Sequence, residues 1–197
     1  MKTIKDIDLK NKNVILRCDY NVPVEDNIIK DNSKIKKSLK TINYLLENNC
    51  KIVILSHFGR VKKEEDKKNN SLLIVAQELA NLLKRDVKFI NDCFSDKVKT
   101  IVTNANLGEV ILLENTRFTD VPNKMESNND ITLSKFFASL GDVYINDAFG
   151  SLHREHSSTA GICKYIPHAI GFLVEEELAN LDILINNTPH PFCVFMG

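Results

Sequence analysis

The chain has 197 residues, of which 43% are hydrophobic and 26% are charged, and its formal net charge is zero. This length and composition predict a globular protein with one hydrophobic core, and they favour one domain over two. A neutral chain has no overall field that would draw it to nucleic acid or to an anionic membrane, and no apolar run approaches the roughly 20 residues of a membrane-spanning helix.

Apolar runs rich in β-branched residues alternate along the chain with segments whose apolar residues recur at helical spacing. The expected strands are 14–21, 51–55, 87–90, 110–113, 143–145 and 170–174, with a further strand starting at 192. The expected helices are 33–48, 71–84, 132–140 and 175–186. Such alternation indicates a parallel sheet covered on both faces, so we predict an α/β fold: a three-layer α/β/α, Rossmann-like domain with a six-stranded parallel sheet.

Two long loops, 61–70 and 119–130, are rich in charged and amide side chains. We expect both to be solvated connections, and the alternative is a mobile flap over a ligand site. The segment Thr188-Pro189-His190-Pro191 ends the last helix, and the apolar run 192–197 has nothing after it. This pattern suggests a truncated chain or a missing second domain.

The start of the chain, from Met1 to Asp6, is charged and has no apolar stretch of signal-peptide length behind it. The five cysteines are odd in number and include no CxxC pair. Buried, reduced thiols are the favoured interpretation, and together these features predict a cytoplasmic protein.

Arginine is scarce: only five of the 26 basic residues are arginine, which leaves 21 lysines. Four of the five, Arg17, Arg60, Arg117 and Arg154, lie in or just after an expected strand, and only Arg85 lies at an ordinary helix end. A planar guanidinium binds carboxylate and phosphate in a two-pronged way that ammonium does not. We therefore predict a cluster of cations for a small, multiply charged anion.

Four expected strands have unusually polar carboxyl ends, which is where ligands bind in open parallel sheets. The segments are Arg17-Cys18-Asp19-Tyr20-Asn21, Ser56-His57-Phe58-Gly59-Arg60, Glu114-Asn115-Thr116-Arg117-Phe118, and Asn146-Asp147-Ala148-Phe149-Gly150 with the following Ser151 to Ser158. In the first segment Arg17, Asp19 and Asn21 alternate, so they point to one face. In the second, Gly59 permits a turn that brings His57 and Arg60 together.

Each segment also has a structural interpretation. The first could be a solvated strand end with a local ion pair, and His57 could be a structural histidine. Glu114 and Arg117 could simply pair with each other. His153 and His156 stand three apart, but no third ligand lies at a familiar metal-binding spacing, so we interpret His156 as a packed or hydrogen-bonded residue. Four such segments on consecutive strands favour a common site.

Motifs for nucleotide binding and for nucleophilic catalysis are absent from the sequence. With seven glycines in all, the chain contains neither GxxxxGK[ST] nor GxGxxG, so nothing in it cradles a di- or triphosphate by those routes. It has no nucleophile elbow, and its histidines lie near arginines rather than beside an exposed nucleophile.

The four segments, written as Arg17-Cys-Asp-Tyr-Asn-Val-Pro-Val24, Leu55-Ser-His-Phe-Gly-Arg60, Leu112-Leu-Glu-Asn-Thr-Arg-Phe118 and Asn146-Asp-Ala-Phe-Gly-Ser-Leu-His-Arg-Glu-His-Ser-Ser158, resemble the signature blocks of phosphoglycerate kinases, in the family's order. The resemblance covers essentially the whole chain. It implies an N-terminal, 3-phosphoglycerate-binding domain over 1–174 and an interdomain helix and linker over 175–191. Residues 192–197 would then begin the first strand of a second domain, which binds ADP or ATP with Mg²⁺ and is absent from this chain.

Carried over residue by residue, the resemblance implies a substrate site. In it Asp19 and Asn21 hydrogen-bond the glycerate hydroxyl and carboxylate region, while arginines and histidines hold the carboxylate and the 3-phosphate. The implied substrate-binding residues are Asp19, Tyr20, Asn21, Lys34, His57, Phe58, Gly59, Arg60, Arg117, His153 and Arg154. The implied catalytic residues are Arg17, Lys34 and Arg154, where Arg17 supports the basic patch from its strand. No metal ligand is expected in this chain.

One departure from the family pattern concerns chemistry. At the start of the first helix the family has an arginine that stabilises the transferring phosphoryl group, and here Lys34 holds that place. Lysine keeps the positive charge but cannot make the two parallel hydrogen bonds that a guanidinium makes. Tyr20, Thr116 and Val61 are smaller departures.

The implied activity is the glycolytic, reversible phosphoryl transfer between 1,3-bisphosphoglycerate and ADP, carried out by a monomer that binds neither nucleic acid nor membrane. We expect the chain alone to bind 3-phosphoglycerate weakly and to transfer phosphate negligibly. The alternative function is a non-catalytic anion-binding module.

Overall fold

The central sheet of the computed structural model, which describes residues 1–186 and 190–193, has six parallel strands in the order β5-β6-β4-β1-β7-β8. The strands are β1 (Asn13–Arg17), β4 (Lys51–Leu55), β5 (Val87–Ile90), β6 (Val110–Leu113), β7 (Val143–Asn146) and β8 (His168–Ile170). A short antiparallel hairpin, β2 (Val24–Glu25) and β3 (Ile28–Ile29), stands apart from it. The predicted six-stranded parallel sheet is confirmed.

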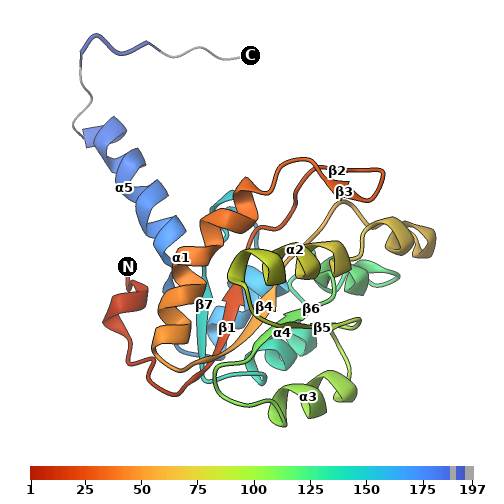
Figure 1. Ribbon diagram of the computed structural model, residues 1–197. Coiled ribbons are helices and arrows are strands. Elements are labelled where there is room, and N and C mark those ends of the chain that lie inside the picture. Colours follow the sequence, from red (N-terminus) through yellow and green to blue (C-terminus); the bar gives the residue numbers. More distant parts are fainter. Residues whose placement is uncertain (187–189, 194–197) are drawn as a thin grey trace.

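Helices cover both faces of this sheet (Figure 1). They are α1 (Ser33–Glu47), α2 (Leu73–Leu83), α3 (Asp96–Thr103), α4 (Ile131–Ala138) and α5 (Phe172–Asn186). Alternation along β1 separates the two cores, because Val14 and Leu16 pack with residues of α1 and α2, whereas Ile15 packs with residues of α3 and α4. The three-layer α/β/α arrangement is therefore also confirmed.

Helix α5 begins beside the sheet and extends away from it (Figure 1). The ring of Phe172 packs edge-on against Tyr44 of α1, with 5.1 Å between the ring centroids. Farther along, Leu181, Ile183, Leu184 and Ile185 are exposed. None of the helices within residues 1–186 and 190–193 has the length and hydrophobicity needed to cross a lipid bilayer.

The strand predicted at 170–174 is wrong, because β8 ends at Ile170 and α5 begins at Phe172. The backbone amides of Leu173 and Val174 donate to Oδ1 of Asp147, which therefore caps the first turn of the helix. A short apolar run does not by itself distinguish a buried strand from a helix. Asp147, whose carboxylate fixes the start of α5, lies after β7 and therefore outside the apolar run itself.

Other differences concern short elements. The strand predicted over 14–21 ends at Arg17, and both α3 and the β2–β3 hairpin were missed. The loop 61–70 contains a 3-10 helix, Glu64–Asn69, that has no buried residue. The loop 119–130 is not wholly solvated, since Glu126 within it is fully buried. Of the strand expected over 192–197, residues 194–197 lie outside the described residues, and so do 187–189 of the expected linker; Phe192 and Cys193 are described outside any strand.

Candidate functional site

The four polar segments follow β6, β4, β1 and β7, which are the four consecutive inner strands of the sheet. Arg17 lies opposite Leu55 of β4 and opposite Asn146 of β7 in the register. Because all the strands are parallel, their carboxyl ends meet at one edge. The structure thus brings together the segments that the sequence singled out.

Arg17 lies beneath this edge and is fully buried. Its Nε donates to Ser158 Oγ over 3.0 Å, one Nη donates to the carbonyl of Cys18, and Nη2 lies 3.2 Å from Nδ1 of His57. A guanidinium has no acceptor, so Nδ1 of His57 must be the acceptor in that contact. His57 is therefore neutral, with its proton on Nε2.

The pKa of His57 supports this assignment. Burial and the charge of Arg17 lower it to about 3, while Asp19 opposes the shift and Arg117 and Arg154 add to it. The ring contributes a hydrogen-bond donor to the site but no charge.

Asp19 and Asn21 follow Arg17 at alternate positions and contact other segments. Asp19 accepts from Lys34 Nζ over 2.9 Å, and Asn21 Oδ1 accepts from the amide of Gly59 over 2.9 Å. Although burial opposes it, the hydrogen bonds from Lys34 and from the Asn21 amide hold the pKa of Asp19 below its ordinary value. Gly59 has φ of +58°, and a Cβ there would lie 1.8 Å from Asn70 Oδ1, so the turn requires glycine.

Asn115 joins the second and third segments. It is fully buried, its Oδ1 accepts from the amides of Phe58 and Arg117, and its Nδ2 donates to the carbonyls of Phe58 and Asn70. These four bonds fix the turn that carries Arg117.

Glu114 does not pair with Arg117, which answers the alternative left open by the sequence. Its carboxylate accepts from Ser71 Oγ and from the amides of Leu72 and Asn115. The guanidinium of Arg117 instead donates to the carbonyl of Gly59 over 3.3 Å, and its Nε is buried without a partner among the described residues.

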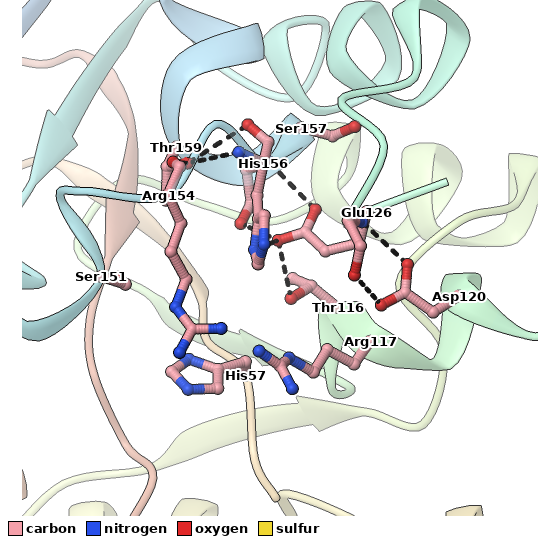
Figure 2. A network of polar contacts seen from close by, with 12 residues as sticks. His57, Thr116, Arg117, Asp120, Glu126, Ser151, Arg154, His156, Ser157 and Thr159 are labelled. Carbon is pink, nitrogen blue, oxygen red and sulfur yellow. Dashed lines mark hydrogen bonds and ion pairs between the residues drawn. The ribbon is translucent and has the colours of Figure 1, made fainter. Parts of the chain in front are cut away.

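Three arginines follow the strands at this edge, and none of their guanidinium groups forms an ion pair with a carboxylate of the described residues. Figure 2 shows the guanidinium groups of Arg117 and Arg154 pointing toward the ring of His57. Burial and the charge of Arg154 lower the pKa of Arg117 below its ordinary value. The guanidinium groups of Arg154 and Arg60, both exposed, make no hydrogen bond or ion pair to any residue that the structure describes. We call Arg60, Arg117 and Arg154, together with the neutral donor His57, the cation cluster.

Two of the expected contact residues have side chains in the core. Tyr20 is fully buried, and its hydroxyl bonds Ser38 Oγ within the α1 side of the core, so its side chain does not face a ligand. Phe58 is also a core residue, and only its backbone borders the turn. His153 is exposed, and its side chain has no hydrogen bond to the described residues.

The carboxylates near the cluster are already engaged within the protein. Asp19 pairs with Lys34, Glu114 accepts from Ser71 and Leu72, and Asp147 caps α5. Within residues 1–186 and 190–193, no group of three or more histidine, cysteine, aspartate or glutamate side chains could hold a metal ion.

Sequence reasoning missed Glu126 and Ser158, which lie next to the predicted site. Glu126 is fully buried, accepts from the Ser158 amide over 3.1 Å and from Thr116 Oγ1 over 3.2 Å, and lies 3.8 Å from His156 Nδ1. Nothing in a polar loop sequence signals that one of its acids is buried.

A hollow of about 910 Å³ lies beside β8; its lining includes Tyr165 and His168 and reaches Asn146 and Leu152 of the fourth segment, but it contains no arginine. The cation cluster is the candidate site because its unmatched charges, rather than the size of a hollow, indicate a ligand.

Acid should destabilise the fold, because His57 accepts a proton near pH 6.5 when unfolded and only near pH 3 when folded. The unfolded chain then binds more protons, so stability falls as pH drops from about 6.5, by up to about 1.4 kcal/mol per pH unit from this residue. Urea unfolding at a series of pH values should show this slope, and His57→Gln should reduce it. An unchanged slope in His57→Gln, with the exposed His168→Gln as control, would contradict the assignment.

The phosphoglycerate kinase family model matches residues 4–197 of the chain. The chain is 52% identical to a phosphoglycerate kinase of Mycoplasma pneumoniae and 46% identical to one of Fusobacterium nucleatum, and each match covers 100% of this chain and 50% of the relative. Among solved structures, it resembles phosphoglycerate kinase from Pyrococcus horikoshii, with a TM-score of 0.86, 31% identity, and coverage of 97% of this chain and 47% of that one. The chain spans about half the length of these relatives.

Proposed function

The chain belongs to the phosphoglycerate kinase family, and we propose that it supplies the 3-phosphoglycerate site for reversible phosphoryl transfer between 1,3-bisphosphoglycerate and ADP. The observation that carries the proposal is the cation cluster: its guanidinium groups form no ion pair with a carboxylate among the described residues, although the charges of Asp120 and Glu126 act on Arg117. Such a cluster suits a small ligand with both a carboxylate and a phosphate. We place the protein in the cytoplasm, as a monomer.

In this proposal the cation cluster holds the two anionic groups of the ligand. Among the residues that the structure describes, the guanidinium groups of Arg60 and Arg154 have no partner, and that of Arg117 is anchored at one nitrogen. His57 donates from Nε2, and His153 extends the basic edge. Asp19 and Asn21 border the cluster and receive the glycerate hydroxyl and carboxylate region.

Phosphoryl transfer needs alignment and positive charge around three equatorial oxygens more than covalent help. Arg154 and Lys34 supply charge from this chain, and Arg17 supports the cluster from below. In the proposal, ADP or ATP with Mg²⁺ binds to the half of the relatives' length that these 197 residues do not span, and the transfer takes place when the two halves close. Isolated, the chain binds substrate and turns over negligibly.

Replacing a single arginine of the cluster should weaken 3-phosphoglycerate binding by about 10- to 100-fold, since hydrogen bonds between charged groups contribute about 1.5–3 kcal/mol each. Calorimetric titration of Arg60→Ala and Arg154→Ala measures this directly. Arg85→Ala is the matched control, because Arg85 is exposed and lies just before β5, at the opposite edge of the sheet. Undiminished binding by both cluster variants, or no binding by the wild type, would refute the proposed site.

The second candidate function is a non-catalytic anion-binding module, and Lys34 is the observation that favours it. Its ammonium forms an ion pair with Asp19, and an ammonium cannot bind a phosphoryl group in a bidentate manner. A coupled ATP assay, with the half of the Mycoplasma pneumoniae relative that this chain does not match added as a separate polypeptide, distinguishes the two functions. Turnover supports the kinase; its absence despite intact 3-phosphoglycerate binding supports the module.

A further inference from the structure

A buried carboxylate lies behind the cation cluster, on a loop that the sequence alone marks as solvent-exposed. Glu126 belongs to loop 119–130, and both it and Ser158 have no exposed surface. Figure 2 shows Glu126 on the far side of Thr116 and His156 from the guanidinium groups of Arg117 and Arg154. It therefore does not neutralise the cluster by direct contact.

Hydrogen-bond directions connect this carboxylate to the site. The Nε of Arg17 only donates, so Ser158 Oγ accepts from it over 3.0 Å. The hydroxyl proton of Ser158 is then free to point to Oε1 of Glu126, with which it makes a close contact. The Ser158 amide adds a second bond to the other carboxylate oxygen over 3.1 Å. The order is thus His57, Arg17, Ser158, Glu126.

The buried charge of Arg17 explains why a carboxylate stands at the end of this series of contacts. Arg17 is a fully buried cation, and an unpaired buried charge is costly. Asp19 is held by Lys34, which leaves Glu126, one hydroxyl away, as the carboxylate linked to Arg17. Burial raises the pKa of Glu126, and the charge of Arg17 and the bonds from Ser158 oppose that rise.

We propose that Glu126 is a positioning residue: acting through Ser158 and Arg17, it keeps His57 neutral with Nε2–H presented to the ligand. The part of this inference that concerns the ligand rests on the proposed function. A neutral donor among arginines binds an anion without adding to their mutual repulsion. The loop 119–130 then supports the site from its buried side and does not cover the ligand.

The tautomer of His57 can be read without any ligand. Nitrogen-15 spectra distinguish protonated from unprotonated ring nitrogens, and His57→Gln assigns the signals among the five histidines. In the wild type we expect an unprotonated Nδ1 and a protonated Nε2 from pH 5 to 8. The charged groups around His57 are Arg17 and Asp19 from the first segment, Arg117 from the third and Arg154 from the fourth.

Two variants break the connection at different points. In Glu126→Ala and Ser158→Ala, the Nδ1 signal should move toward its protonated position, and protonation of the ring should begin within pH 5 to 8. Glu126→Asp keeps a carboxylate for Ser158 and Arg17 and should restore the wild-type signals. Ser127→Ala is the matched control, because its exposed hydroxyl bonds Asp120 on the same loop and not the connected residues. Binding of 3-phosphoglycerate should weaken about tenfold in Ser158→Ala.

Wild-type signals for His57 in both alanine variants, with folded amide spectra, would overturn the inference. Should neither variant fold, the wild type decides: an unprotonated Nδ1 together with a slowly exchanging Arg17 Nε–H supports it, and a protonated Nδ1 at neutral pH overturns it. If the wild type fails to bind 3-phosphoglycerate, the proposed function falls while the tautomer result still stands. If it binds and His57 is insensitive to both variants, only the positioning role falls.

Discussion

Replacing Arg17 with methionine should lower the free energy of unfolding by about 3–5 kcal/mol, the usual cost of removing one partner from a buried pair of charges. Arg17 and Glu126 are both fully buried and are linked through Ser158. The variant would leave the carboxylate without its counter-charge and the Ser158 hydroxyl without a donor. For a chain of this length, the melting temperature should fall by roughly 6–20 °C.

A double variant identifies the cause. Arg17→Met combined with Glu126→Gln removes both charges and keeps a hydrogen-bonding group beside Ser158, so it should be more stable than Arg17→Met alone. The control is Arg85→Met at an exposed arginine, for which a change within about 0.5 kcal/mol is expected. A wild-type melting temperature for Arg17→Met would contradict this description of the core.

Asn115→Ala should be the most damaging substitution of a neutral residue at the site. It removes four hydrogen bonds and leaves the amides of Phe58 and Arg117 and the carbonyls of Phe58 and Asn70 without partners in a buried region. Each unsatisfied buried group costs about 1–3 kcal/mol before water or relaxation recovers part of it, so we expect a loss of at least about 3 kcal/mol. Urea unfolding measures it.

The same substitution should weaken 3-phosphoglycerate binding more than tenfold, because Asn115 fixes the turns that carry Arg60 and Arg117. Asn123→Ala is the control: Asn123 is exposed, and its side chain makes no hydrogen bond to the described residues. Equal stability of the two variants would show that the polar link between the second and third segments is dispensable.

The sheet was predictable because inner parallel strands are apolar on both faces. Ile52-Val53-Ile54 of β4 and Val110-Ile111-Leu112 of β6 are fully or almost fully buried, and such runs stand out in a sequence. The place of the candidate site followed from the same logic, since the polar residues after those strands had to meet at one edge. Arg17, Asp19 and Asn21 all reach that edge.

Other features depend on partners distant in sequence. The start of α5 is set by Asp147, and the burial of Glu126 by Ser158 and Thr116, none of which a local pattern reveals. The side chain of Tyr20 lies in the core, where its hydroxyl is hydrogen-bonded to Ser38 on α1. Alternation along a strand end gives a direction for each side chain, but it does not say whether that direction leads to solvent or into a packed layer.

The most direct test of the proposed site is an amide chemical-shift map recorded while 3-phosphoglycerate is titrated into the chain. We predict saturable shifts in residues 19–21, 57–60, 115–117 and 150–154, at the carboxyl ends of β1, β4, β6 and β7. No saturable shifts, or shifts confined to the hollow beside β8 around Tyr165 and His168, would contradict a 3-phosphoglycerate site at the cation cluster.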